Sequence, residues 1–256
     1  MITIISSAKT MDFSKPILNL QPTYPIYTQC ASNLAEICSK FSLEKLRSIF
    51  VVNDKLAKLN YDRFQNFSSA NKKPAILAYS GDVFQQLDKT NFDYNDLSFA
   101  HKHVAIISGL YGVVKALDFI APYRLEISTK LAPECYGNLY SYWTEKITQY
   151  FNDALLNDTK NKFIVNLASE EYSRAIDRKK LTFPLFSIYF RQIRKNKLEN
   201  IGILTKKARG KMLNMIIKNK IDDIDNLKSF SDEGYQYTPE NSDSQNLVFT
   251  TNLYNL

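Results

Sequence analysis

Short apolar runs alternate with amphipathic segments along this chain, which is typical of a β-sheet covered by helices. Apolar or β-branched runs at residues 1–8, 74–79, 103–108 and 163–167 predict buried strands. Residues 185–194 and 198–205 flank a short polar stretch and predict a β-hairpin, and residues 234–238 and 246–251 predict closing strands.

Apolar residues three and four positions apart predict helices over residues 25–40, 43–50, 54–64, 139–155 and 206–220. Ser42, Asn53 and Thr205 stand where an N-cap is expected for three of these helices. No linker-like segment divides the chain. The pattern therefore predicts one α/β domain over residues 1–256, with a mixed sheet covered by helices.

Composition narrows the class of protein. Hydrophobic residues make up 45% of the chain, enough for a substantial core. No apolar run reaches about 18 residues, so no membrane span is expected. The first ten residues resemble a strand and not a secretory signal. The three cysteines form no CxxC pair, so we expect reduced thiols and a cytoplasmic location.

Positive charge is concentrated in one segment. Residues 172–220 contain 14 Lys and Arg against 2 acidic residues, whereas the net charge of the whole chain is +7. Such a segment is expected either on a polyanion-binding face or on an ordinary solvated surface.

The stretch TKKARGKML (205–213) contributes four of these cations, Lys206, Lys207, Arg209 and Lys211. At the start of a predicted helix each cation is unfavourable by about 0.3–1 kcal/mol. A bound phosphate would remove that penalty.

Polar residues follow four of the predicted strands, in SAKT, SGD, SGLYG and ASEEY. Ligands of α/β sheets bind beyond the carboxyl ends of the strands, so these residues predict a crevice. Alternatively, the strand ends turn polar because they reach the surface. The candidate pocket residues are Lys9, Asp82, Tyr111, Arg124, Glu126, Ser169, Glu171 and Lys206.

No known catalytic template accompanies that crevice. The sequence has no P-loop, no GxGxxG and no GxSxG motif, so no cofactor is predicted. GLYG (109–112) reads as a tight turn. His101 and His103 form an HxH pair that would lie on a strand, but no third ligand is evident, so no metal site is predicted.

Six collinear motifs carry a resemblance. SSAKTMDF (6–13), YSGDVF (79–84), SGLYGVVKALDFIAPYRLEI (108–127), NLASEEY (166–172), KKARG (206–210) and NLKSFSDEGY (226–235) closely resemble the YaaA family of bacterial peroxide-stress proteins. The resemblance runs from Met1 to about residue 250. It implies a cytoplasmic, peroxide-induced, compact α/β protein with a positively charged cleft, which binds duplex DNA through a helix-hairpin-helix and is linked to lower unincorporated iron.

Carried onto this chain, the helix-hairpin-helix falls at residues 46–67, with LAKLN (56–60) in the hairpin. Such hairpins usually contain a glycine, and Lys58 stands in its place here. The first motif reads SSAKT where SPAKT is usual in the family. The implied DNA contacts are Lys9, Lys55, Lys58, Arg124, Lys206, Lys207, Arg209 and Lys211, with Arg63 as a further source of charge.

Two functions stay open at this point. The leading one is a stress protein that binds duplex or structured DNA, protects it from damage and lowers free iron indirectly. The alternative is an enzyme that acts on a phosphorylated or carboxylated small molecule. In the first case Asp82, Glu126 and Glu171 need another role, such as ion pairing with Arg124 or Lys206.

Overall fold

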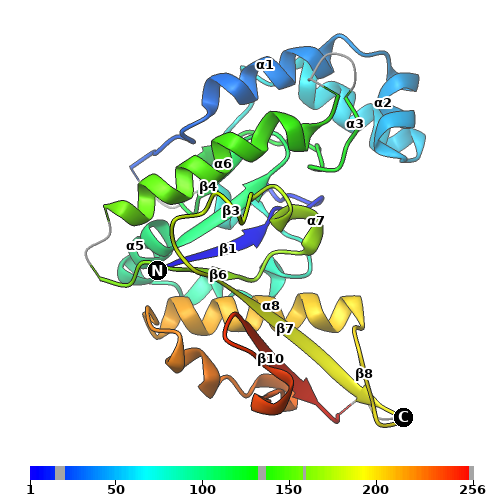
Figure 1. Cartoon of the computed structure of the whole chain (residues 1–256). Coiled ribbons are helices and arrows are strands. Elements are labelled where there is room, and N and C mark those ends of the chain that lie inside the picture. Colours follow the sequence, from blue (N-terminus) through cyan, green and yellow to red (C-terminus); the bar gives the residue numbers. More distant parts are fainter. Residues whose placement is uncertain (15–20, 132–136, 158–159, 254–256) are drawn as a thin grey trace.

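The computed structural model describes residues 1–14, 21–131, 137–157 and 160–253. Among these residues, eight strands form one mixed sheet in the order β4-β3-β1-β6-β7-β10-β9, with β8 paired to β7 (Figure 1). The strands are β1 (Ile2–Ser6), β3 (Val104–Ser108), β4 (Gly112–Lys115), β6 (Ile164–Asn166), β7 (Leu185–Arg194), β8 (Lys197–Glu199), β9 (Gln236–Tyr237) and β10 (Asn246–Thr251). A separate pair joins β2 (Lys73–Pro74) to β5 (Phe119–Ile120). The predicted α/β class with a mixed sheet is confirmed.

The centre of the sheet is parallel. β1 lies between β3 and β6, and both pairings are parallel, as are those of β6 with β7 and of β7 with β10. The chain crosses from β1 to one neighbour and later returns to the other, so the strand order reverses at β1. In such sheets the crevice beyond the carboxyl ends at the reversal is the usual ligand-binding position.

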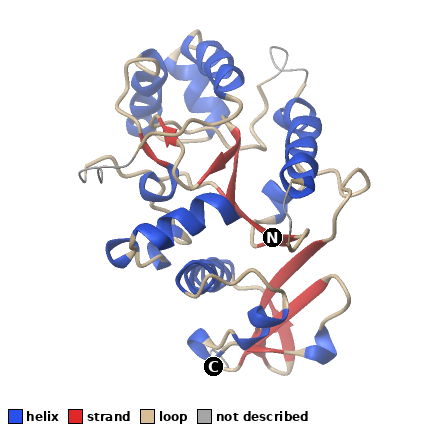
Figure 2. Cartoon of the chain, turned by 90° about the vertical axis from the view of Figure 1, so that its left-hand side faces the viewer, coloured by secondary structure: helices blue, strands red, loops and turns tan. Residues whose placement is uncertain are grey.

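Helices lie on both sides of this sheet (Figure 2). α6 (Leu139–Leu156) packs next to β4, whereas α5 (Tyr94–His103) and α8 (Gly202–Lys218) pack against β3 and β7. The apolar side of α6 places Trp143 fully inside the core, where its indole N–H donates to the Gly109 carbonyl oxygen.

α1 (Thr28–Ser39), α2 (Leu43–Phe50) and α3 (Asp54–Gln65) form the upper part of the molecule in Figure 1. The single turns α4 (Ala75–Ala78) and α7 (Glu170–Ser173) complete the α-helices among the described residues, which also contain five short 3-10 helices. Ser42 and Asn53 cap α2 and α3 as predicted, accepting from the backbone N–H groups of Lys45 and Leu56.

Two predicted strands were wrong. Residues 75–78 form the single helical turn α4, because a short buried apolar run has no periodicity that separates strand from helix. The predicted second hairpin strand ends at Glu199, and residues 202–205 already belong to α8.

The expected start of α8 was therefore also wrong. Its N-cap position is Ile201, and Thr205 lies inside the helix, where its hydroxyl donates to Asn200 Oδ1 at 2.6 Å instead of capping. Lys206 is the fifth residue of α8, so the cations begin after the first turn. These cations therefore do not lie at the unpaired N–H groups of the helix start, and the helix terminus gives no reason to expect a phosphate beside them.

Two smaller expectations also change. LAKLN lies within α3, and the connection between α2 and α3 is residues 51–53, so the hairpin was misplaced. His101 and His103 lie in the last turn of α5, not on a strand. GLYG does form the tight turn between β3 and β4.

Candidate functional site

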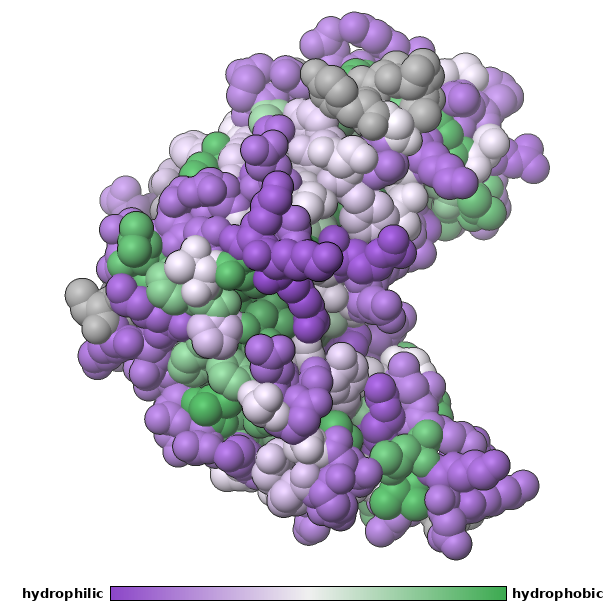
Figure 3. All heavy atoms as spheres, in the orientation of Figure 1, coloured by the Kyte–Doolittle hydropathy of each residue, from purple (hydrophilic) through white to green (hydrophobic). Residues whose placement is uncertain are grey.

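One side of the molecule is hollowed between the upper helices and the part that contains β8, and its surface is largely hydrophilic (Figure 3). The carboxyl ends of the parallel strands lie toward this side (Figure 1). The polar residues that follow β1, β3 and β6 meet there, as the sequence predicted.

Hydroxyl groups link these strand ends. Ser6 Oγ, at the end of β1, lies 3.2 Å from Ser169 Oγ and accepts from the Ser169 backbone N–H. Tyr123 Oη lies 2.6 Å from both Ser108 Oγ and Tyr79 Oη. We call Ser6, Ser108, Ser169, Tyr79 and Tyr123 the hydroxyl cluster. Burial raises the pKa of both tyrosines, so their hydroxyls stay protonated and act as neutral hydrogen-bonding groups.

Two ion-pair groups border the hydroxyl cluster. Glu126 accepts from Arg124 at 3.1 Å and from Lys9 at 2.7 Å, and Asp82 lies 3.3 Å from Lys206 Nζ. Two of the three acidic residues that the sequence left without a role in a phosphate-binding protein, Asp82 and Glu126, therefore pair with cations, as one reading of the sequence allowed. Arg124 Nε is buried and has no hydrogen-bond partner among the described residues.

A cavity of about 750 Å³ opens next to the hydroxyl cluster, between α7, β7 and the first turns of α8. Ser169 and Lys206 line it, so it is continuous with the strand ends. Five cations and one acidic residue are among the residues that line it: Arg174, Arg178, Arg191, Lys206, Arg209 and Glu170. We call this space the arginine cavity.

Arg209 is the most enclosed cation of the arginine cavity. Its Nε is buried and has no hydrogen-bond partner among the described residues. Burial, together with the nearby charge of Arg191, lowers the pKa of Arg209 to about 10, and the guanidinium still carries its charge at neutral pH. A buried cation without an opposite charge is unfavourable, and an anion in the cavity would relieve it.

The remaining predicted residues lie elsewhere. Tyr111 is buried in the core, and its hydroxyl accepts from the Ala121 backbone N–H. Glu171 accepts from the Ser128 hydroxyl at 2.6 Å. Lys55 and Lys58 are exposed toward the start of α3, and Lys58 pairs with Asp62. Lys207 is half-buried on α8 and does not line the arginine cavity.

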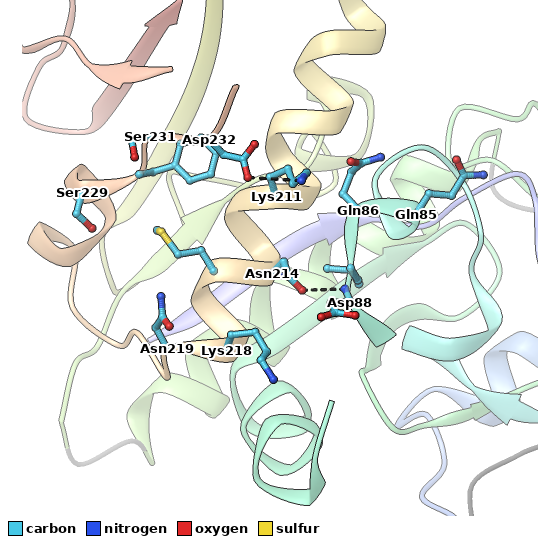
Figure 4. A pocket seen from close by; sticks show the side chains of 13 residues that line it. Gln85, Gln86, Asp88, Lys211, Asn214, Lys218, Asn219, Ser229, Ser231 and Asp232 are labelled. Atoms are coloured by element: carbon cyan, nitrogen blue, oxygen red, sulfur yellow. Dashed lines mark hydrogen bonds and ion pairs between the residues drawn. The ribbon is translucent and has the colours of Figure 1, made fainter. Parts of the chain in front are cut away.

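Lys211 faces the opposite flank of α8. There it lines a second cavity of about 730 Å³ and lies 3.5 Å from Asp232 (Figure 4). Lys218 and Asp88 also line that cavity, so its cations and acidic residues balance. Asn214 accepts from the Asp88 backbone N–H, which ties α8 to the segment before α5.

Sequence reasoning missed three arginines of the arginine cavity, Arg174, Arg178 and Arg191. All three belong to the basic segment 172–220, and the first two follow the ASEEY strand end at helical spacing. The charge density of that segment was the signal that could have identified them. Arg63 was named only as a source of charge on α3. Burial and the charge of Arg124 lower the pKa of Arg63.

The histidines have structural contacts. His103 Nδ1 donates to the Met1 carbonyl oxygen at 2.9 Å, and His101 Nδ1 accepts from the Leu117 backbone N–H. In the part of the chain that the structure describes, no three His, Cys, Asp or Glu side chains gather closely enough to hold a metal ion.

Cys30 and Cys38 are not in a disulfide, and Cys135 lies outside the described residues. None of the described helices combines the length and the apolar character that a membrane span requires.

Comparison with known proteins gives a consistent result. Residues 1–241 match the family model described as "Peroxide stress protein YaaA". The chain is 45% identical to a UPF0246 protein of Crocosphaera subtropica over 249 residues, which cover 97% of this chain and 99% of the relative. It is 43% and 42% identical to UPF0246 proteins of Rickettsia bellii and Rickettsia felis, with the same coverage. The chain therefore belongs to the YaaA family of peroxide stress proteins.

Proposed function

We propose that this protein binds duplex or structured DNA in the cytoplasm, without sequence specificity, as part of the peroxide stress response. The observation that carries the proposal is the arginine cavity, where five cations and one acidic residue line a single space in the hollowed side of the molecule. Bound there, the protein would shield DNA from oxidative damage, and an effect on free iron would be indirect.

Arginine suits this role because its planar guanidinium donates two parallel hydrogen bonds to a phosphate group. Arg174 and Arg178 are exposed at the rim, where the phosphates on a duplex surface can reach them. Such contacts position a duplex but carry no sequence information. The negative charges of Asp82 and Glu126 are compensated by cations. Asp82 pairs with Lys206, and Glu126 pairs with Lys9 and Arg124.

The salt dependence of binding tests this proposal. Each phosphate contact releases counterions, so the logarithm of the affinity falls with the logarithm of salt concentration by about 0.9 per contact. We expect the double variant Arg174→Ala, Arg178→Ala to weaken binding to all duplex sequences alike and to reduce the slope by about 2. The measurement is fluorescence anisotropy with duplexes of several sequences at several salt concentrations.

Lys160→Ala is the matched control. Residue 160 precedes β6 and therefore lies toward the amino ends of the parallel strands, on the edge opposite the arginine cavity. The control should bind as the unchanged protein does. An unchanged slope in a folded double variant would remove the arginine cavity from the DNA interface.

A second candidate is an enzyme that acts on a phosphorylated or carboxylated small molecule. It is favoured by the hydroxyl cluster, which lies beside the arginine cavity and next to Glu126, a carboxylate held between Lys9 and Arg124. If this group is catalytic, Glu126→Ala and Asp82→Ala should abolish protection of cells against peroxide and leave DNA affinity intact. Folded variants that protect fully would exclude the enzyme.

A further inference from the structure

The cations of the arginine cavity differ in how exposed they are. The side chains that line this cavity carry five positive charges and one negative charge. Arg174, Arg178 and Lys206 are exposed, whereas Arg209 Nε has no solvent contact. The cations therefore extend from the rim to the floor of one space.

Neutral donors accompany the cations. Ser187 is buried, lines the cavity, and accepts from Arg178 at 2.9 Å and from Asn166 at 3.5 Å. Since both of those groups donate to its oxygen, the Ser187 hydroxyl hydrogen is left to donate. Arg209 Nε–H is a second donor without a partner among the described residues. The half-buried guanidinium of Arg209 and the Ser187 hydroxyl hydrogen, both at the same basic cavity, suit an acceptor with several anionic oxygens.

A phosphomonoester matches these donors better than a phosphodiester. A terminal phosphate carries about −1.5 to −2 charge at neutral pH and has three strong acceptor oxygens. A phosphodiester carries a single negative charge, and both its sides are joined to sugars. Lys206 pairs with Asp82, so an excess of three positive charges remains in the cavity and favours the dianion.

The partial burial of Arg209 further restricts the ligand. A phosphate within a DNA strand is joined to the chain on both sides, so it reaches the exposed arginines more readily than the half-buried guanidinium of Arg209. The phosphate at the end of a strand is joined on one side only and can enter the cavity.

We propose that the arginine cavity binds the terminal phosphate of a DNA strand, with Arg209, Arg191 and the Ser187 hydroxyl contacting the phosphate oxygens and Arg174 and Arg178 holding the adjoining backbone. Because the cavity opens within the proposed DNA-binding face, this site rests on the proposed function. With this site, the protein recognises broken DNA ends in addition to binding duplex DNA.

The test uses the full chain and three duplexes of one sequence. One duplex has phosphorylated ends, one has hydroxyl ends, and one is closed at both ends by hairpin loops. Fluorescence anisotropy measures the affinity for each. We expect the phosphorylated duplex to bind at least about tenfold more tightly than the other two, as for a charge-assisted contact that only it can make.

Arg209→Met should remove this preference, because the affinity for the phosphorylated duplex should fall by more than the affinity for the closed duplex. Arg209→Lys keeps the charge but loses the planar fork, and should reduce the preference without removing it. Lys211→Met is the control, since it removes a cation from the same helix on the flank away from the cavity. Circular dichroism shows whether each variant folds. If Arg209→Met does not fold, Arg209→Lys still provides the test.

The other possible results distinguish the terminal-phosphate site from the proposed binding of duplex DNA. Equal affinity for all three duplexes would overturn the terminal-phosphate site and leave duplex binding in place. Binding of the phosphorylated duplex alone would support the site and argue against duplex binding along the face. If adenosine monophosphate displaces bound duplex and the duplexes show no preference among ends, the cavity belongs to a small molecule and the proposed site is wrong.

Discussion

Gly210 offers a stability test of how α8 is held against the rest of the molecule. A Cβ at this position would lie 2.2 Å from the Val83 carbonyl oxygen and 2.8 Å from Gln86 Cβ. A Cβ on Gly202, in the same helix, would meet nothing within 4 Å. Replacing each glycine with alanine therefore makes the same chemical change in a tight and in an open environment.

The expected effects have opposite signs. Alanine is favoured over glycine in a helix by up to about 1 kcal/mol, so Gly202→Ala should raise the free energy of unfolding by a few tenths to 1 kcal/mol. At Gly210 the clash is with backbone, and α8 must move by about 0.8 Å to bring the closest contact to 3.0 Å. Overpacking of this kind costs roughly 1–3 kcal/mol. The two variants should differ by about 2 kcal/mol, with Gly210→Ala the less stable.

Urea denaturation followed by circular dichroism measures both values, and anisotropy measures DNA binding. Lys206 lies one turn before Gly210 and pairs with Asp82, which belongs to the same loop as Val83. Displacing α8 should therefore also weaken DNA binding in Gly210→Ala and not in Gly202→Ala. If both variants are equally stabilised and bind DNA equally, the close packing of α8 on residues 83–86 is not what fixes its position.

Three further changes have defined outcomes. Burial would raise the pKa of Asp96, but hydrogen bonds from Lys218 and Lys220 outweigh it and lower the pKa to about 2, so this stabilisation is complete above the unfolded value of 3.8 and is lost as pH falls toward 2. Asp96→Asn should lower the free energy of unfolding by roughly 2 kcal/mol at neutral pH, and this free energy, measured by urea denaturation at a series of pH values, should fall less steeply in acid than it does in the unchanged protein. Parallel pH dependences of the two proteins would refute the assignment. Tyr123→Phe removes the hydroxyl that lies 2.6 Å from both Ser108 Oγ and Tyr79 Oη, and the loss of these buried hydrogen bonds should lower the free energy of unfolding by about 1–3 kcal/mol. An unchanged urea midpoint would be the contrary result. All three cysteines should react with an alkylating reagent after denaturation without reductant. Cys30 and Cys38 cannot be bridged, because they are eight residues apart on α1, about 12 Å along its axis. A disulfide found by mass spectrometry would contradict this.

The sequence predicted those elements whose local signals agree with their surroundings. β1, β3 and β6 are buried runs that end in polar residues, and their ends do meet. Ser42 and Asn53 identified helix starts because a cap is a local interaction. Local signals failed at residues 75–78, where burial by the surrounding sheet and helices decided the conformation. They also failed at Thr205, which lies inside α8 and whose hydroxyl donates to Asn200.

The site was predictable in part for a related reason. Charge density along the sequence identified the basic segment, and the strand-end rule identified Lys9 and Ser169. Asp82 follows a run that forms α4 and not a strand, and Glu126 was named only as a residue that could lie near the crevice. Which arginines share a cavity depends on how α7, β7 and α8 pack, and no spacing within one element contains that information. Arg191 on β7 and Arg209 on α8 became neighbours only through the fold.

The basic segment itself divides into two groups once the contacts are known. Several of its cations hold the fold: Lys218 and Lys220 both bind Asp96 on α5, Lys211 pairs with Asp232, and Arg194 lies near Glu199. Of the cations that line the arginine cavity, Lys206 pairs with Asp82, and the four arginines share the cavity with a single acidic residue, Glu170. Their positive charge is therefore not balanced by acidic residues lining the same space, and that imbalance points to a polyanion more directly than the total charge of the segment does. A substitution in the first group should change stability, and one in the second should change binding.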